Sequence, residues 1–190
     1  MGYKTWMRCF FGMGIDHQLA LELVELRDRA VRKLAGAGPR PIPAGNFHVT
    51  LAFLGDLPAE RLPLLEDCAR SLLPRVRSGC IHFRQAHCFP DDRSRIFALE
   101  GEPDEPARHF YRHLCQCIAD AGFPVEHRDF RPHITIVRLQ HSFVPAPRWP
   151  LEASHRIRDF CLFESVPRAS GVRYRIINRW ELPEPAGAVE

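Results

Sequence analysis

The sequence predicts an α+β protein in which a duplicated unit forms two lobes related by a pseudo-two-fold axis. Antiparallel sheets are expected to form a central cleft, with helices outside. A pattern of strand, helix and strand occurs twice, and each copy ends in a histidine, an apolar residue and a threonine. The two histidines, His48 and His133, lie 85 residues apart in a chain of 190. The chain has no glycine-rich phosphate loop, which disfavours a doubly wound parallel sheet.

The first unit lies near the N-terminus. Residues 7–15 form an apolar run that predicts a buried strand, and Asp16 then stands where a helix N-cap is expected. Apolar residues recur every three or four positions from Leu19 to Leu34, which predicts one apolar stripe on a helix. A proline-rich loop then leads to the first His-x-Thr strand, over residues 47–54.

The rest of the chain contains the second unit and the closing strands. Pro63 suits the first turn of a helix, and Gly122 suits a helix end. In chain order, the pattern predicts a helix over residues 58–73, strands over 80–89 and 96–99, a helix over 106–121, the second His-x-Thr strand over 133–139, a proline-rich loop, and strands over 157–163 and 172–180. The connections are short, so we expect one domain over residues 1–190, with one His-x-Thr strand in each lobe.

The amino-acid composition limits the classes of function that the chain can have. The formal net charge of +3 tolerates an anionic substrate but does not indicate a surface that coats nucleic acid. Seven cysteines without a regular framework favour reduced thiols and a cytoplasmic protein. No apolar run approaches the ~18 residues that a membrane span needs, so no membrane partner is expected.

The two His-x-Thr segments carry the chemistry. Side chains alternate between the faces of a strand, so His48 shares a face with Thr50, and His133 shares a face with Thr135. If the two strands lie side by side, these faces form a site with two imidazoles. An unperturbed imidazole titrates near pH ~6.5, so such a pair can donate and accept protons near neutrality.

The duplicated pattern resembles the 2H phosphoesterase superfamily, and within it the LigT-like RNA 2′,3′-cyclic phosphodiesterases, also called the 2′-5′ RNA ligase family. The resemblance rests on two blocks, residues 46–55 (NFHVTLAFLG) and residues 130–138 (FRPHITIVR). It extends to the opening strand near residues 8–16 and to the closing strands over residues 160–182, and therefore covers nearly the whole chain.

The resemblance implies a hydrolase that opens the terminal 2′,3′-cyclic phosphate of an RNA or oligonucleotide to a 2′-phosphomonoester, with no metal and no other cofactor. By the same resemblance, His48 is the proton donor to the departing 3′-oxygen and His133 is the proton acceptor from water. Residue type alone does not order the two histidines. Thr50 and Thr135 are expected to hold phosphate oxygens. We expect the protein to act as a monomer.

Further residues are expected to bind the substrate. Arg131 lies two positions before His133, so strand alternation places it on the same face, where its guanidinium could bind phosphate. Arg138 lies an odd number of positions away, which favours the opposite face unless a bulge shifts the register. The aromatic candidates for stacking on a nucleobase, for which packing in the core is the favoured interpretation, are Phe11, Phe53 and Tyr174.

Two other functions stay open at this point. A 2′-5′ RNA ligase acting on tRNA halves would use the same histidines in the reverse direction, although water at high concentration favours hydrolysis. A non-catalytic RNA- or nucleotide-binding module would keep the cleft, although the presence of both histidines and both threonines argues against it. His109, His113 and Cys117 follow one another at intervals of four residues on one predicted helix. One straight helix cannot surround a tetrahedral metal ion by itself, so no metal site is expected there.

Overall fold

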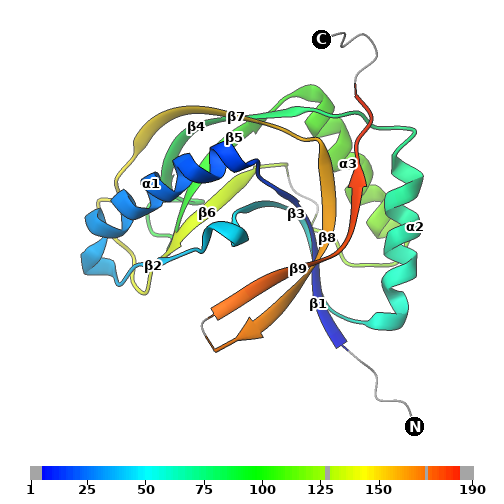
Figure 1. Cartoon of the computed structure of the whole chain (residues 1–190), viewed down its shortest axis with the longest axis horizontal. Helices are drawn as coiled ribbons and strands as arrows, with labels where there is room; N and C mark the ends of the chain where they lie inside the picture. The colour runs from blue at the N-terminus through cyan, green and yellow to red at the C-terminus, as the bar shows by residue number, and fades with distance from the viewer. Residues whose placement is uncertain (1–5, 127–128, 170, 185–190) are drawn as a thin grey trace.

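The structure confirms the predicted α+β class. The computed structural model describes residues 6–126, 129–169 and 171–184 (Figure 1). Within these residues the chain forms three α-helices and one antiparallel sheet of nine strands. The helices are α1 (His17–Lys33), α2 (Leu62–Leu72) and α3 (Glu105–Asp120). The strands are β1 (Trp6–Gly14), β2 (Arg40–Pro41), β3 (His48–Pro58), β4 (Cys80–Cys88), β5 (Ile96–Pro103), β6 (His133–Arg138), β7 (Trp149–Arg156), β8 (Asp159–Arg168) and β9 (Gly171–Glu181).

The two His-x-Thr strands lie at the centre of the sheet. The strand order is β7-β4-β5-β6-β3-β1-β8-β9, and the short β2 also pairs with β6. The central strands β3 and β6 pair through Val49 and Ile134. On either side, β6 pairs with β5 and β3 pairs with β1. The strands of both halves therefore form one continuous sheet rather than separate sheets, and the two histidine-bearing strands lie side by side.

The helices pack on one face of this sheet. Buried helix residues such as Leu23, Leu65 and Leu114 belong to one apolar cluster together with Phe11 of β1 and Ile134 of β6. Figure 1 shows α1 towards the β4–β6 side of the sheet, and α2 with α3 towards the β8–β9 side. Because side chains alternate along each strand, the opposite face of the sheet carries the histidines and threonines of β3 and β6.

Local sequence explains where the helices begin. The Asp16 carboxylate accepts a hydrogen bond from the Leu19 N–H at 2.8 Å, which confirms the predicted N-cap of α1. Asp104 caps α3 in the same way by accepting from the Ala107 N–H at 2.8 Å. Pro63 lies in the first turn of α2, where a helix needs no N–H from that residue.

The proline-rich segment after β6 contains a strand that the sequence did not predict. In β7, Pro150 pairs opposite Gln85 of β4, and β7 forms one edge of the sheet. An edge strand tolerates proline because one side of its backbone has no neighbouring strand. The short β2 also lies in a segment predicted as a loop. The strand predicted over residues 157–163 begins at Asp159 and continues to Arg168 as a hairpin with β9.

Three structural observations bear on the compositional expectations. Within the described residues, no helix combines the length and the apolar character that a membrane span requires. All seven cysteines are free thiols. The rings of His109 and His113 lie 4.3 Å apart on α3, but no group of three histidine, cysteine or acidic side chains in the described part of the chain could hold a metal ion.

Candidate active site

The pairing of β3 with β6 brings the four predicted catalytic residues together. His48 begins β3 and His133 begins β6. The antiparallel register of the two strands places His48 beside Thr135 and Thr50 beside His133. All four side chains are half-buried, so they are accessible from one face while the residues between them anchor the strands in the core.

The two histidines make the same hydrogen bond. The Nδ1–H of His48 donates to the carbonyl of Asn46 at 2.7 Å, and the Nδ1–H of His133 donates to the carbonyl of Arg131 at 3.1 Å. A carbonyl can only accept, so each neutral ring carries its hydrogen on Nδ1. The Nε2 atoms are therefore the atoms that gain and lose protons. The Nε2 of His48 lies 3.1 Å from the Thr50 hydroxyl, which donates to it when the ring is neutral.

A bulge in β6 brings Arg138 to the site face. Neighbouring residues of β5 pair with Thr135 and Val137, so Ile136 is an extra residue. A bulge shifts the alternation of side chains by one position, and Arg138 therefore faces the same side as Thr135. Unbroken alternation favoured the opposite face for Arg138, and the bulge corrects that expectation. The Arg138 side chain is exposed.

A bulge at the equivalent position in β3 brings Phe53 to the same face. Neighbouring residues of β1 pair with Thr50 and Ala52, so Leu51 is the extra residue. The side chain of Phe53 is 62% exposed. Phe53 and Arg138 each lie five residues after a site histidine. One half of the site therefore offers an aromatic ring where the other half offers a cation.

Aromatic rings from three strands enclose His48. Its ring centroid lies 5.1 Å from that of Phe10 on β1 and 6.3 Å from that of Phe163 on β8. Tyr174 on β9 packs edge-on against His48, with centroids 4.8 Å apart and planes at 76°. Phe10 also contacts Phe163 and Tyr174, and the three rings belong to a small apolar cluster on this face. The imidazole is thus the polar group of an otherwise apolar wall.

The surroundings of His48 control its ionisation. Burial lowers the pKa of His48 from its usual 6.5 to about 4, because the charged form loses solvation. The hydrogen bond to the Asn46 carbonyl raises the pKa, and the positive charges of His133 and Arg138 lower it further. His48 is therefore neutral at pH 7 in the free protein. The contribution of Arg138 indicates that its positive charge lies near this ring.

His133 packs on a different ring, and Arg131 is engaged beside it. Phe89 stacks on His133 with centroids 4.1 Å apart and planes at 22°. The guanidinium of Arg131 lies 4.8 Å from the centre of the same Phe89 ring. Arg131 also donates to the Glu100 carboxylate, from Nε at 3.0 Å and from Nη2 at 2.6 Å. Arg131 is therefore held by an ion pair to β5 rather than presented as an uncompensated cation for phosphate.

The three aromatic residues predicted to stack on a nucleobase lie in different environments. Tyr174 lies against the site, and Phe53 is exposed on the site face. Phe11 is fully buried in the core beneath the sheet, so its assignment to substrate binding was wrong. Because side chains alternate along β1, the neighbouring Phe10 takes the place beside His48.

Sequence reasoning missed several residues of the site. They are Phe10, Asn46, Phe89, Glu100 and Phe163. Phe10 had a usable signal, because the odd-numbered residues from Met7 to Met13 are all apolar and a period of two assigns Phe10 to the other face. Asn46 lies two residues before His48, and its main-chain carbonyl contacts the ring locally. Phe89, Glu100 and Phe163 reach the site from strands distant in the sequence, which no local pattern encodes.

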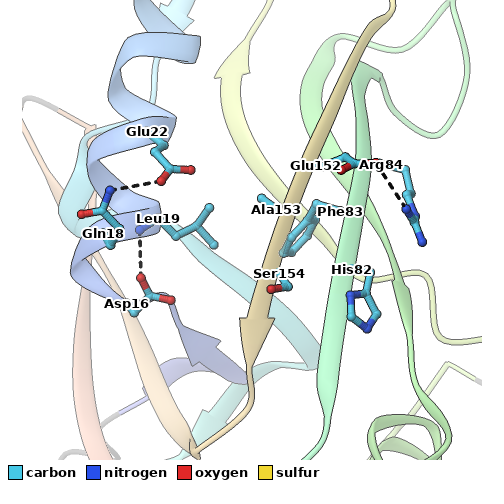
Figure 2. A pocket seen from close by; sticks show the side chains of 10 residues that line it. All are labelled: Asp16, Gln18, Leu19, Glu22, His82, Phe83, Arg84, Glu152, Ala153 and Ser154. Atoms are coloured by element: carbon cyan, nitrogen blue, oxygen red, sulfur yellow. Dashed lines mark hydrogen bonds and ion pairs between the residues drawn. The ribbon is translucent and has the colours of Figure 1, made fainter.

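A small pocket lies beside His133. It has a volume of about 40 Å³ and is lined by Thr50, His133, Arg131 and Phe53, among others, but not by His48. A larger pocket, of about 410 Å³, lies between α1 and the strands β4 and β7, with Asp16, Glu22 and Glu152 among its lining residues (Figure 2). None of the four predicted catalytic residues lines this larger pocket. The site is thus an open face of the sheet rather than a deep cavity.

The fold and the paired His-x-Thr strands define a two-histidine α+β protein. A sequence model of the 2′-5′ RNA ligase superfamily matches residues 17–151. The chain belongs to this superfamily. The RNA 2′,3′-cyclic phosphodiesterase of Escherichia coli (strain K12) is 28% identical over 178 residues, which are 93% of this chain and 97% of that protein.

Solved structures show the same architecture. A protein of Thermus thermophilus superimposes with a TM-score of 0.81, at 24% identity over 94% of this chain and 99% of that one, which is a likeness of fold. Escherichia coli LigT in its apo form superimposes with a TM-score of 0.79, at 27% identity over 95% of this chain and 99% of that one. Other structures of Escherichia coli LigT are complexes with 3′-AMP and with phosphate.

Proposed function

We propose that the chain is an RNA 2′,3′-cyclic phosphodiesterase that opens a terminal 2′,3′-cyclic phosphate to a 2′-phosphomonoester. The observation that carries the proposal is the matched pair of histidines on adjacent strands, each donating from Nδ1 to the carbonyl two residues earlier. This arrangement offers two Nε2 atoms for proton transfer on one face. The relative named for this activity and the LigT complexes with 3′-AMP and phosphate support the same class of substrate.

The proposed reaction uses one base and one acid. His133 Nε2 takes a proton from water as the water oxygen attacks phosphorus. The bond between phosphorus and the 3′-oxygen breaks, and His48 Nε2 gives its proton to that oxygen. The product carries a 2′-phosphate and a 3′-hydroxyl. The two histidines have then exchanged protonation states, and a proton exchange with solvent restores them.

The low pKa of His48 has a consequence for this scheme. In the free protein the pKa of about 4 leaves His48 neutral at pH 7, whereas a proton donor must carry a proton. A negatively charged cyclic phosphate beside the ring favours the imidazolium and raises its pKa. We therefore propose that binding of the substrate, and not the free protein, prepares His48 as the acid.

Three neighbouring groups are proposed to hold the phosphate. The hydroxyls of Thr50 and Thr135 donate to its oxygens, and the guanidinium of Arg138 stabilises the negative charge that grows there in the transition state. The Thr50 hydroxyl, 3.1 Å from His48 Nε2, exchanges this hydrogen bond for one to phosphate when the substrate binds. No step in this scheme calls for a metal ion or an organic cofactor.

We further propose that residues 1–190 form one domain of two pseudo-symmetric lobes, which meet at the site on β3 and β6. Counted outward from β3 and β6, each side of the sheet has three further strands, so β1 corresponds to β5, β8 to β4 and β9 to β7. The bulges after Thr50 and Thr135 occupy corresponding positions. A monomer with this arrangement contains the complete site, and RNA with a cyclic phosphate end is its proposed partner.

A turnover assay tests the function. The purified protein is incubated in EDTA with a short RNA that ends in a 2′,3′-cyclic phosphate, with and without an RNA that carries a 5′-hydroxyl. We expect loss of the cyclic phosphate at the same rate with and without added magnesium. Joined RNA as the main product would favour the ligase instead. Tight binding of the RNA without any turnover would contradict the proposal and indicate a binding module.

A further inference from the structure

Asn46 lies two residues before His48 and contacts the site in two ways. Its main-chain carbonyl accepts the hydrogen bond from His48 Nδ1–H at 2.7 Å. Its side chain reaches β9, where Nδ2 donates to the carbonyl of Val172 at 2.6 Å and Oδ1 accepts from the N–H of Tyr174 at 3.5 Å. One residue therefore connects the ring of His48 with a strand that lies 126 residues away in the chain.

The side-chain amide of Asn46 has the hydrogen-bonding groups that the free edge of β9 requires. β9 is the last strand in the sheet order, so the backbone groups on its outer side have no neighbouring strand. The carbonyl of Val172 and the N–H of Tyr174 point to the same side because they are two residues apart. A side-chain amide offers one acceptor and a donor group, like the peptide unit of a neighbouring strand. Aspartate would lack the donor, and alanine would lack both.

The contacts between the Asn46 side chain and β9 also fix the aromatic rings that pack beside His48. Tyr174 packs edge-on against His48 with centroids 4.8 Å apart. Phe10 contacts both rings, at 5.1 Å from His48 and 5.0 Å from Tyr174. By holding β9 at Tyr174, Asn46 fixes the ring that flanks the imidazole as well as the hydrogen bond that orients it.

We infer that Asn46 is the positioning residue of His48. Its side chain, bound to β9, fixes the direction of its own carbonyl. That carbonyl keeps the ring hydrogen on Nδ1, so Nε2 is available for proton transfer. The part of this inference that concerns turnover rests on the proposed function, whereas the effect on the ring is a property of the free protein.

The other half of the site uses a different anchor for the equivalent residue. Arg131 also lies two residues before its histidine, and its carbonyl accepts from His133 Nδ1–H at 3.1 Å. Its side chain is held by Glu100 of β5, at 3.0 and 2.6 Å. Both halves therefore tie the residue that orients the histidine to another strand of the sheet, by an amide in one half and by an ion pair in the other.

Two variants test the inference, each compared with a matched control. Asn46→Ala removes both contacts to β9, and Asn46→Asp keeps the size of the side chain but removes the donor. The control is Asn178→Ala, which changes a half-buried asparagine on the same strand whose Oδ1 accepts only from the adjacent Arg179 N–H among the hydrogen bonds of the described residues. Nitrogen NMR of the histidine rings at pH 7 reports the tautomer, and steady-state kinetics on a cyclic phosphate gives kcat and KM.

Both Asn46 variants are expected to convert His48 from the single Nδ1–H tautomer to a mixture, while His133 keeps its tautomer. We expect kcat to fall about tenfold with little change in KM, since the carbonyl that orients His48 is no longer held by the side-chain contacts to β9 while the substrate contacts remain. Asn178→Ala is expected to leave both measurements unchanged.

Retention of the Nδ1–H tautomer and of wild-type kcat in both Asn46 variants would overturn the inference. An equal loss in Asn178→Ala would also overturn it, because the effect would then come from a general loosening of β9. If the wild-type protein turns over no cyclic phosphate, the proposed function fails. A change of the His48 tautomer in the Asn46 variants would support the positioning role even in that case.

Discussion

His48 is kept neutral in the free protein by its surroundings. Burial lowers its pKa to about 4, and the positive charges of His133 and Arg138 act in the same direction. A bound phosphate anion would act against all three causes by favouring the imidazolium. The pKa of His48 is therefore expected to differ between the free protein and its complex with substrate, and this difference can be measured.

The pH dependence of turnover should report this difference. The profile of kcat/KM reflects ionisation in the free enzyme, and that of kcat reflects ionisation in the enzyme–substrate complex. Because His48 acts as the proton donor, its deprotonation contributes to the loss of rate as the pH rises. Burial lowers the pKa of His48 in the free protein, and bound phosphate raises it, so we expect the basic limb to lie at higher pH in kcat than in kcat/KM. Basic limbs at the same pH in both profiles would contradict this account.

His48 also predicts how folding responds to pH. Between about pH 6.5 and 4 the unfolded chain binds a proton at this residue, whereas the folded protein does not. The free energy of unfolding should therefore fall as the pH is lowered through this range, by ~3 kcal/mol from this group. Denaturant unfolding of the wild type and of His48→Gln measures the effect. We expect the difference in stability between them to change across this range and to be constant above pH 7; a constant difference throughout would refute the assignment.

Substitution of either histidine should abolish most of the turnover. His48→Ala and His133→Ala are each expected to lower kcat by ~10²-fold or more, the usual scale for a positioned proton transfer. Both residues lie on the open face of the sheet, so circular dichroism should show an intact fold. His109→Ala, a half-buried histidine of α3 outside the site, is the control. Wild-type turnover in either site variant would remove that histidine from the mechanism.

At the scale of elements, the bulges in β3 and β6 decide which side chains join the site. Each bulge follows the threonine of a His-x-Thr segment and turns the third residue after that threonine to the site face. Phe53 takes this place in β3 and Arg138 takes it in β6. The two halves of the nearly symmetric site therefore differ at this position, by an aromatic ring in β3 and a cation in β6.

The bulge in β6 gives Arg138 a testable role. Arg138→Gln should lower kcat/KM at least about tenfold, because a charge-assisted contact to phosphate is lost. The matched control is Arg112→Gln, which changes an exposed arginine of α3. Kinetics at several salt concentrations provide the measurement. An unchanged kcat/KM, or an equal loss in the control, would show that Arg138 does not bind the substrate.

Helices and strands could be predicted from the sequence where the pattern that specifies them lies within the element itself. The period of Leu19 to Leu34 and the N-cap at Asp16 are local signals, and α1 was predicted almost as observed. β7 was missed because Pro150 argues against a strand, and only the position of β7 at the sheet edge makes the proline acceptable. The place of Arg138 depended on a bulge, which reflects pairing with β5 rather than the sequence of β6 alone.

At the scale of the whole molecule, the site exists because the sheet joins the two halves at β3 and β6. His48 and His133, far apart in the chain, become neighbours through this one strand pairing. The duplication of the His-x-Thr pattern made this meeting predictable. The aromatic wall of Phe10, Phe163 and Tyr174 was not predictable in the same way, because each ring comes from a different strand and has no counterpart in the motif.

The position of the phosphate in the product tests the account most directly. The protein, in EDTA, is allowed to hydrolyse a nucleoside 2′,3′-cyclic phosphate to completion, and phosphorus NMR then distinguishes the 2′-phosphate from the 3′-phosphate. The account predicts the 2′-phosphate alone, because His48 protonates the departing 3′-oxygen. A 3′-phosphate product, or a requirement for added metal, would contradict it.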